Sequence, residues 1–295
     1  MNRKLLLSIF YLAIIVISLA RPQAQATVMP VDSLRIFVSI LPQKYFAEQI
    51  FPQPVSIQAL IGPGQSPHTY EPSPQKIAAL SKADIYLTIG LPFEQRLLAK
   101  SADIFNRVQI VDTRRGITFR HMETHHDEHD EHEGTLDPHF WLDPVMAKTM
   151  IRNMVPGDSD LWPLLRRNRV FEAINLRLDS LDAYIAAKLA PFKGQKLYVF
   201  HPSFGYFCDR YGLEQVAIET EGKEPSARQL AKLIEQAKAD HVKVIIIQSQ
   251  FSQKTARAIA SEIGAEVISL DPLAYDYINN MKHMADTIAD ALSKR

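Results

Sequence analysis

The sequence predicts an α/β protein of two doubly wound lobes, each with a parallel sheet, joined by a long helix. Two observations predict this fold: short β-rich segments alternate with helical ones in two separate series, and one long apolar periodicity lies between the series. Strands separated by helices favour parallel sheets with right-handed crossovers. The length of 295 residues, 46% of them apolar, is enough for two cores, and the single cysteine excludes a disulfide scaffold.

The first series begins at Arg35, and turn residues bound its β-rich segments. Their composition predicts strands at 36–40, 55–60, 85–89 and 108–111. Between them, Ser73 followed by Pro74 is typical of a helix start. Helices are predicted at 43–50, 74–82 and 93–100.

The second series begins after Lys196 and repeats the same alternation. Strands are predicted at 197–200, 216–218, 244–247 and 267–269. Helices are predicted at 227–237, 254–263 and 277–292. A second lobe of the same class as the first is therefore expected.

One long helix is predicted between the two series. It starts near Asp160, Pro163 is tolerated in its first turn, and Pro191 ends it. Thirty helical residues would span about 45 Å, the width of two small lobes. A helix that joins the lobes is one interpretation, and a surface helix inside one lobe is the other. The apolar residues that recur every three or four positions are Phe171, Ile174, Leu178, Leu181, Ile185 and Leu189.

Residues 1–26 are predicted to be an export signal. A basic start is followed by the apolar segment Leu5–Leu19 and by the small-x-small pattern Ala24-Gln25-Ala26. The apolar segment has 15 residues, fewer than the roughly 20 that a membrane span needs. An uncleaved anchor is the alternative. The single cysteine, Cys208, cannot form an internal disulfide, and it lies far from the cleavage point where a lipid would be attached. An exported protein of this kind is expected in a bacterial periplasm.

The charge balance makes nucleic acid an unexpected partner. Without residues 1–26 the chain has 30 basic and 33 acidic residues, a net charge of −3. Residues 121–133 hold five histidines and six carboxylates with no lysine or arginine, which predicts a solvated loop. The expected division is a first lobe over 27–157, a linker helix over 158–191 and a second lobe over 192–295.

Three histidines and one aspartate are candidate metal ligands. His68 and His201 follow predicted strands, and Asp271 follows another, at the sheet edge where α/β proteins bind ligands. His139 lies in an aromatic segment between the two series. Neutral imidazoles and one carboxylate suit zinc. The alternative for each histidine alone is a hydrogen-bonded structural residue, and for Asp271 a turn residue before Pro272.

Five motifs together resemble one family. Read in chain order, they are GPGQSPHTYEPSP, DPHFWLDP, VFHPSFGYFCDRYGL, IETEGKEPSARQL and ISLDPLA. Over nearly the whole mature chain the sequence is similar to the zinc and manganese solute-binding proteins of ABC importers. The resemblance implies two lobes joined by a rigid backbone helix, with one ion in the cleft between them. It also implies a monomer that is not an enzyme and that delivers Zn²⁺ to a membrane permease.

By position, the family's metal ligands correspond to His68, His139, His201 and Asp271. Manganese-selective members usually have Glu where His201 stands, and imidazole favours zinc over the harder Mn²⁺. In some zinc members three histidines bind with a water or a nearby Glu, so Asp271, Glu71 or water remain alternatives for the fourth ligand. Glu71 is also a candidate hydrogen-bond partner of a ligating histidine.

Zinc-specific members often have a His- and acid-rich insertion, which resembles residues 121–133. Flexible imidazoles there would bind zinc weakly and raise its concentration near the main site. The expected auxiliary ligands are His125, His126, His129 and His132. An acidic loop without metal is the alternative.

Three other functions were considered. A manganese or iron importer component is disfavoured by His201 and the His-rich loop. A zinc hydrolase would need a general base beside the metal, for which Glu71 is the candidate. A surface adhesin is disfavoured by the absence of a lipid-anchor cysteine.

Overall fold

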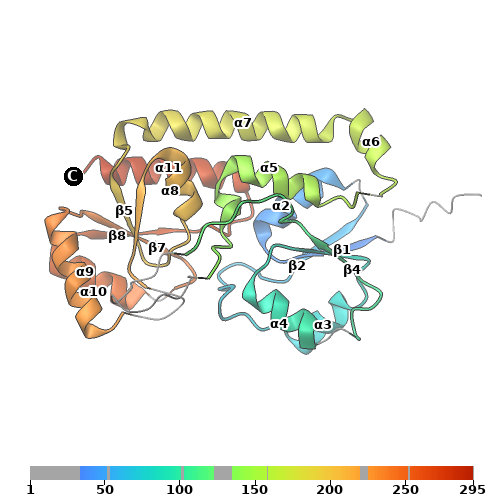
Figure 1. The fold of residues 1–295 in the computed structure, drawn as a ribbon, viewed down its shortest axis with the longest axis horizontal. Coiled ribbons are helices and arrows are strands. Elements are labelled where there is room, and N and C mark those ends of the chain that lie inside the picture. Colours follow the sequence, from blue (N-terminus) through green and yellow to red (C-terminus); the bar gives the residue numbers. More distant parts are fainter. Residues whose placement is uncertain are drawn as a thin grey trace, which may run out of the picture.

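Two parallel four-stranded sheets form the framework of the protein in a computed structural model (Figure 1). The structure describes residues 34–51, 54–100, 103–122, 135–157, 159–219, 225–251 and 253–294. The first sheet has the order β2-β1-β3-β4, with β1 (Arg35–Val38), β2 (Ser56–Ala59), β3 (Ile85–Thr88) and β4 (Gln109–Asp112). The second has the order β6-β5-β7-β8, with β5 (Lys196–Val199), β6 (Glu214–Ala217), β7 (Val244–Gln248) and β8 (Glu266–Leu270).

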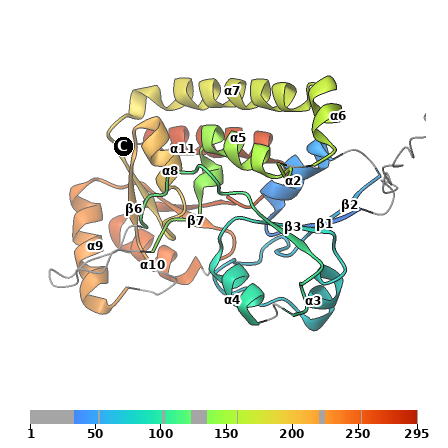
Figure 2. The same cartoon turned by 45° about the vertical axis from the view of Figure 1, so that its right-hand side comes forward.

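Helices cover both faces of each sheet, which confirms two doubly wound lobes (Figures 1 and 2). One layer, on the side of the longest helix, contains α2 (Leu41–Ile50), α5 (Pro144–Asn153), α8 (Gly205–Tyr211) and α11 (Tyr277–Leu292). The opposite faces carry α3 (Pro74–Leu80), α4 (Pro92–Lys100), α9 (Ala227–Ala239) and α10 (Gln253–Ile263).

The longest helix, α7 (Val170–Leu189), joins the lobes. It contacts α2 and α5 on the first lobe and α8 and α11 on the second. Its buried face holds Ile174, Leu178, Leu181, Ile185 and Leu189, which are five of the six residues of the predicted apolar periodicity. The prediction of a connecting helix is therefore confirmed, and the surface helix within one lobe is wrong.

The start of the connecting helix was predicted wrongly. The segment from Asp160 contains a separate short helix, α6 (Trp162–Arg167), and Arg169 then takes a left-handed conformation with φ 52° before α7 begins. The ring of Trp162 stacks on Phe171 across this break, with centroids 5.4 Å apart. A folded-back turn thus buries aromatic surface that a straight helix would expose. The 20 residues of α7 span about 30 Å.

One hydrophobic core is shared by both lobes. Its buried members include Ile36 of β1, Leu197 of β5, Leu178 of α7 and Ile288 of α11. A smaller second cluster lies between the second sheet and helices α9 and α10. Because the main core is continuous, the relative position of the lobes is fixed by packing as well as by α7.

Two elements of the shared layer, α5 and α8, were not predicted. Helix α5 starts where the Asp143 side chain accepts hydrogen bonds from the amides of Val145 and Met146. Helix α8 ends at Gly212, whose φ of 75° favours glycine. Among the described residues, none of the helices has the length and apolar character to cross a membrane. The predicted export signal, residues 1–26, lies outside the described residues.

Candidate metal centre

Three histidines from three separate segments converge between the lobes. His68 lies in the loop after β2, His139 precedes a 3-10 turn (Phe140–Leu142), and His201 follows β5. The Nε2 atom of His201 lies 2.9 Å from Nε2 of His68 and 3.4 Å from Nε2 of His139. Two nitrogens on a tetrahedral zinc ion lie about 3.3 Å apart, given the usual Zn–N distance of about 2.05 Å. Two of the three nitrogen pairs are therefore close to the spacing on one zinc ion, and all three ligand atoms lie within 4.8 Å of one another.

The site is enclosed by aromatic and apolar side chains. The ring of Phe251 stacks on His201 with centroids 4.9 Å apart, and Trp141 lies 5.2 Å from His139. His139 and His201 are 4% and 2% exposed, while His68 is partly buried. The cavity at the three rings measures about 20 Å³, which suits a single ion or water.

A buried carboxylate holds each of the two inner imidazoles. Asp137 Oδ1 accepts hydrogen bonds from His139 Nδ1 at 2.7 Å and from the His139 amide at 2.9 Å. Glu219 accepts a hydrogen bond from His201 Nδ1. Because the proton is held on Nδ1, the lone pair of each Nε2 atom is directed at the common centre. This arrangement pre-orients two ligands before any metal arrives.

The environment favours the neutral form of His68 and His201, which is the form that binds a metal ion. Burial, followed by the nearby rings of His201 and His139, lowers the pKa of His68 from 6.5 to about 3. Burial also lowers the pKa of His201, although the hydrogen bond to Glu219 acts in the opposite direction. Protons therefore compete weakly with a metal ion near pH 7.

The structure brings together three of the four predicted ligands. Among the described residues, the ligand atoms of His68, His139 and His201 lie within 4.8 Å of one another, and Asp271 is outside this group. The Asp271 carboxylate accepts hydrogen bonds from Gln250 Nε2 at 2.6 Å and from the Leu273 amide at 2.9 Å. Its role as the fourth ligand stays a prediction.

The residues that support the histidines were not predicted from the sequence. Glu219 directly follows Ile218 at the end of β6, at the same sheet edge as His201, so its position after a strand was an available signal. Gln248 accepts from the His201 amide and donates to the His201 carbonyl at 2.6 Å and to Ser203 Oγ at 2.8 Å. Glu71 is not a partner of these rings: it is exposed and lines another surface pocket.

The predicted auxiliary ligands His125, His126, His129 and His132 lie outside the described residues. The described residues on either side of them are held together, because the Met122 amide donates to the Thr135 carbonyl at 2.9 Å and His121 pairs with Leu136. Asp137, the partner of His139, follows two residues after Thr135. The described residues that flank this segment are thus close in the chain to His139 and its partner Asp137.

Comparison with known proteins gives one consistent family. The family model described as ZnuA, zinc-uptake complex component A periplasmic, matches residues 36–291. The high-affinity zinc uptake system protein ZnuA of Bacillus subtilis (strain 168) is 31% identical over 290 residues, covering 88% of each chain. The zinc-binding lipoprotein AdcA of Streptococcus pneumoniae (strain ATCC BAA-255 / R6) is 29% identical, and this chain spans 50% of its length.

Solved structures agree with this assignment. A crystal structure of ZnuA is 39% identical, has a TM-score of 0.79, and is matched over 88% of this chain and 99% of that one. A zinc-bound ZnuA deletion mutant lacking 138–173 has the same identity and TM-score over 88% of this chain and 98% of that one. The match covers both lobes, α7 and the segments that carry all three histidines. This chain therefore belongs to the ZnuA family of periplasmic zinc-uptake components.

Proposed function

We propose that this protein captures Zn²⁺ in the periplasm as a monomer and delivers it to the permease of a membrane ABC importer. The observation that carries the proposal is the convergence of the His68, His139 and His201 imidazoles on one point between the lobes, in a chain of the ZnuA family. Zinc is cargo here, so the chain needs to bind and release it without making or breaking a covalent bond.

The proposed ligands are His68, His139 and His201, with Asp271 or a water in the fourth position. Charge balance supports a divalent ion in this buried place. Asp137 and Glu219 each contact one inner imidazole, so two negative charges lie behind the ligands and offset the two positive charges of zinc.

The manganese alternative is less compatible with the site. Mn²⁺ prefers oxygen ligands and a higher coordination number, whereas the grouped ligand atoms here are nitrogens in a cavity of about 20 Å³. A hydrolase is also less compatible, because Glu71, the base that such an enzyme was predicted to use, lies in a different pocket.

Uptake by cells tests this function directly. Cells that lack the protein should grow poorly when a chelator limits zinc, and added zinc but not manganese should restore growth. Re-expression of the wild type should restore uptake of labelled zinc, and re-expression of His139→Ala should not. The control His283→Ala changes an exposed histidine of α11 and should behave as wild type. Unchanged zinc uptake without the protein would contradict the proposal.

The auxiliary histidines are proposed to bind further zinc ions weakly. Replacing His125, His126, His129 and His132 by Gln should lower the number of zinc ions bound at saturation while one tight site remains. Loss of the tight site in this variant would mean that the segment supplies a primary ligand.

A further inference from the structure

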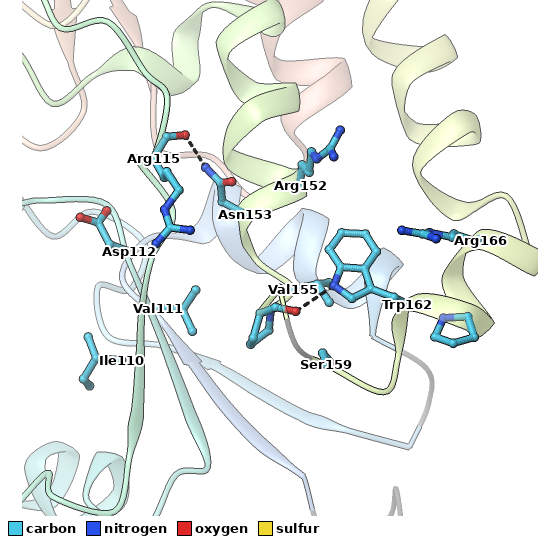
Figure 3. Close-up of a pocket in the computed structure, with 13 residues that line it drawn as sticks. Ile110, Val111, Asp112, Arg115, Arg152, Asn153, Val155, Ser159, Trp162 and Arg166 are labelled. Carbon is cyan, nitrogen blue, oxygen red and sulfur yellow. Dashed lines mark hydrogen bonds between the residues drawn. The ribbon is translucent and has the colours of Figure 1, made fainter.

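A second, larger cavity lies on the first lobe, away from the metal site. It measures about 910 Å³ and is bounded by the edge strand β4, the end of α5 and the short helix α6 (Figure 3). It shares no lining residue with the three-histidine cavity. Its volume is in the range of small-molecule sites, about 300–1,000 Å³.

Three arginines from three different elements line this cavity: Arg115 after β4, Arg152 of α5 and Arg166 of α6. Within the described part of the chain, none of the three forms an ion pair. Among the described lining residues Asp112 is the one acidic residue, and its carboxylate accepts hydrogen bonds from Arg114 Nε at 2.9 Å and Nη2 at 2.8 Å. The described lining therefore holds more arginines than carboxylates, on a chain whose formal net charge is zero.

The walls of the cavity are held in place before any ligand binds. Trp162 Nε1 donates to the Pro156 carbonyl at 2.8 Å, and the indole stacks on Phe171. Asn153 Nδ2 donates to the carbonyls of Thr113 and Arg115, at 3.0 and 2.8 Å, and so ties the loop after β4 to α5 (Figure 3). These bonds fix the backbone from which the arginines extend.

Trp162 also gives the cavity an apolar face. The guanidinium carbon of Arg166 lies 6.0 Å from the centroid of the Trp162 ring. The remaining lining includes aliphatic surface from Ile110, Val111 and Val155. A ligand held here would have its charged groups near the arginines and its carbon skeleton against the indole.

We propose that this cavity binds a small polyanion, a molecule with two or more carboxylate or phosphate groups. Guanidinium groups form paired hydrogen bonds with the oxygens of both groups, and unpaired arginines in a concave site favour such ligands. The apolar face accommodates a carbon skeleton between the charges. This site is separate from the proposed zinc site and adds a second ligand class to the protein.

The fluorescence of Trp162 can report the binding of an anion in this cavity. The chain has two tryptophans, and the other, Trp141, is fully buried beside His139. Metal-stripped protein is titrated with citrate and, separately, with pyrophosphate, and tryptophan fluorescence is followed at constant ionic strength. We expect a saturable change in fluorescence with at least one of the two anions. The anion that binds more tightly shows whether the cavity prefers carboxylate or phosphate groups. Triethyl citrate, the uncharged analogue, should give no change, and neither should the anion added to Trp162→Phe.

Arginine variants assign the binding to this cavity. Arg115→Gln and Arg166→Gln should each weaken anion binding by about tenfold, since a hydrogen bond to a charged group is lost. Arg228→Gln, an exposed arginine of α9, is the matched control and should bind as wild type. All three variants should bind zinc normally in calorimetry. No saturable change with either anion, or equal binding by all three variants, would overturn the proposal.

Discussion

At the scale of single residues, the metal site depends on groups that the metal would not touch. Glu219 and Asp137 hold the inner imidazoles with Nε2 directed at the centre. The sequence predicted His68, His139 and His201 because they follow strands or lie in a distinctive motif. It did not predict that Glu219 pairs with His201, because the order of the strands brings together these two residues, which lie 18 positions apart. Asp137 lies only two positions before His139, so this second partner was a local signal that was missed.

Removing the charge behind His201 should weaken zinc binding. Glu219→Gln keeps the shape of the side chain but loses one negative charge in a site where both partners are buried. We expect zinc affinity to fall about 10–100-fold with one site retained, measured by competition with a chelator. Glu235→Gln on the exposed face of α9 is the control. Equal affinities in the two variants would show that Glu219 has no part in binding.

The pH dependence of stability should report the buried His68. Its pKa is about 3 in the folded protein against 6.5 when unfolded, so between these values the unfolded chain binds more protons. The free energy of unfolding of metal-free protein should therefore fall as pH drops below 6.5. We expect the free energy of unfolding, measured in urea, to fall between pH 7.5 and pH 5, and to fall by about 2 kcal/mol less in His68→Gln than in the wild type.

The comparison with His68→Gln is needed because Glu94 changes the stability with pH in the direction opposite to His68. Burial raises the pKa of Glu94 to about 7, so between pH 4.5 and 7 its contribution to the free energy of unfolding falls as the pH rises. Glu94 is unchanged in His68→Gln, and its effect cancels in the difference. An identical loss in wild type and variant would contradict the assigned environment of His68.

At the scale of elements, the connecting helix shows what periodicity predicts and what it misses. The spacing of Leu178 and its neighbours identified the buried face of α7 correctly. The break at Arg169 was missed because a stacking contact between Trp162 and Phe171 determines it. Helix α8 was missed because it is short and its first four residues are all buried, so that it has no clear helical periodicity. Helix α5 has one buried face, with Ala147, Met150 and Ile151, and this pattern was a signal that was missed.

Shortening a side chain should cost more stability on the buried face of α7 than on its exposed face. On α7 itself, Leu178 is fully buried and Leu176 is 67% exposed. Leu178→Ala should lower the free energy of unfolding by about 2–5 kcal/mol, and Leu176→Ala should change it by less than about 1 kcal/mol, in urea titrations of metal-free protein. Similar effects in both variants would mean that α7 is not packed as described.

At the scale of the whole molecule, the metal site is built from both lobes on one continuous core. His68 comes from the first lobe and His201 from the second, and Tyr277 of α11 donates to the Trp141 carbonyl at 2.7 Å beside His139. The site therefore exists only when both lobes are folded and docked. Ligand binding to such a site stabilises the entire fold.

Zinc should raise the thermal stability of the protein as one cooperative unit. Free zinc at 100 times its Kd should add about 2.7 kcal/mol to the free energy of unfolding, and a chelator should reverse this. Calorimetric scans should show one transition that moves upward with zinc in the wild type but not in His201→Ala. Two transitions, of which zinc moves only one, would contradict a site shared by both lobes.

The central claim is that three imidazoles form one tight, zinc-selective site, and isothermal titration tests it most directly. Metal-stripped wild type and His139→Ala are titrated with Zn²⁺ and, separately, with Mn²⁺. We expect one tight zinc site in the wild type, much weaker binding of Mn²⁺, and loss of the tight site in the variant. A tighter response to Mn²⁺, or a tight zinc site that survives in His139→Ala, would contradict it.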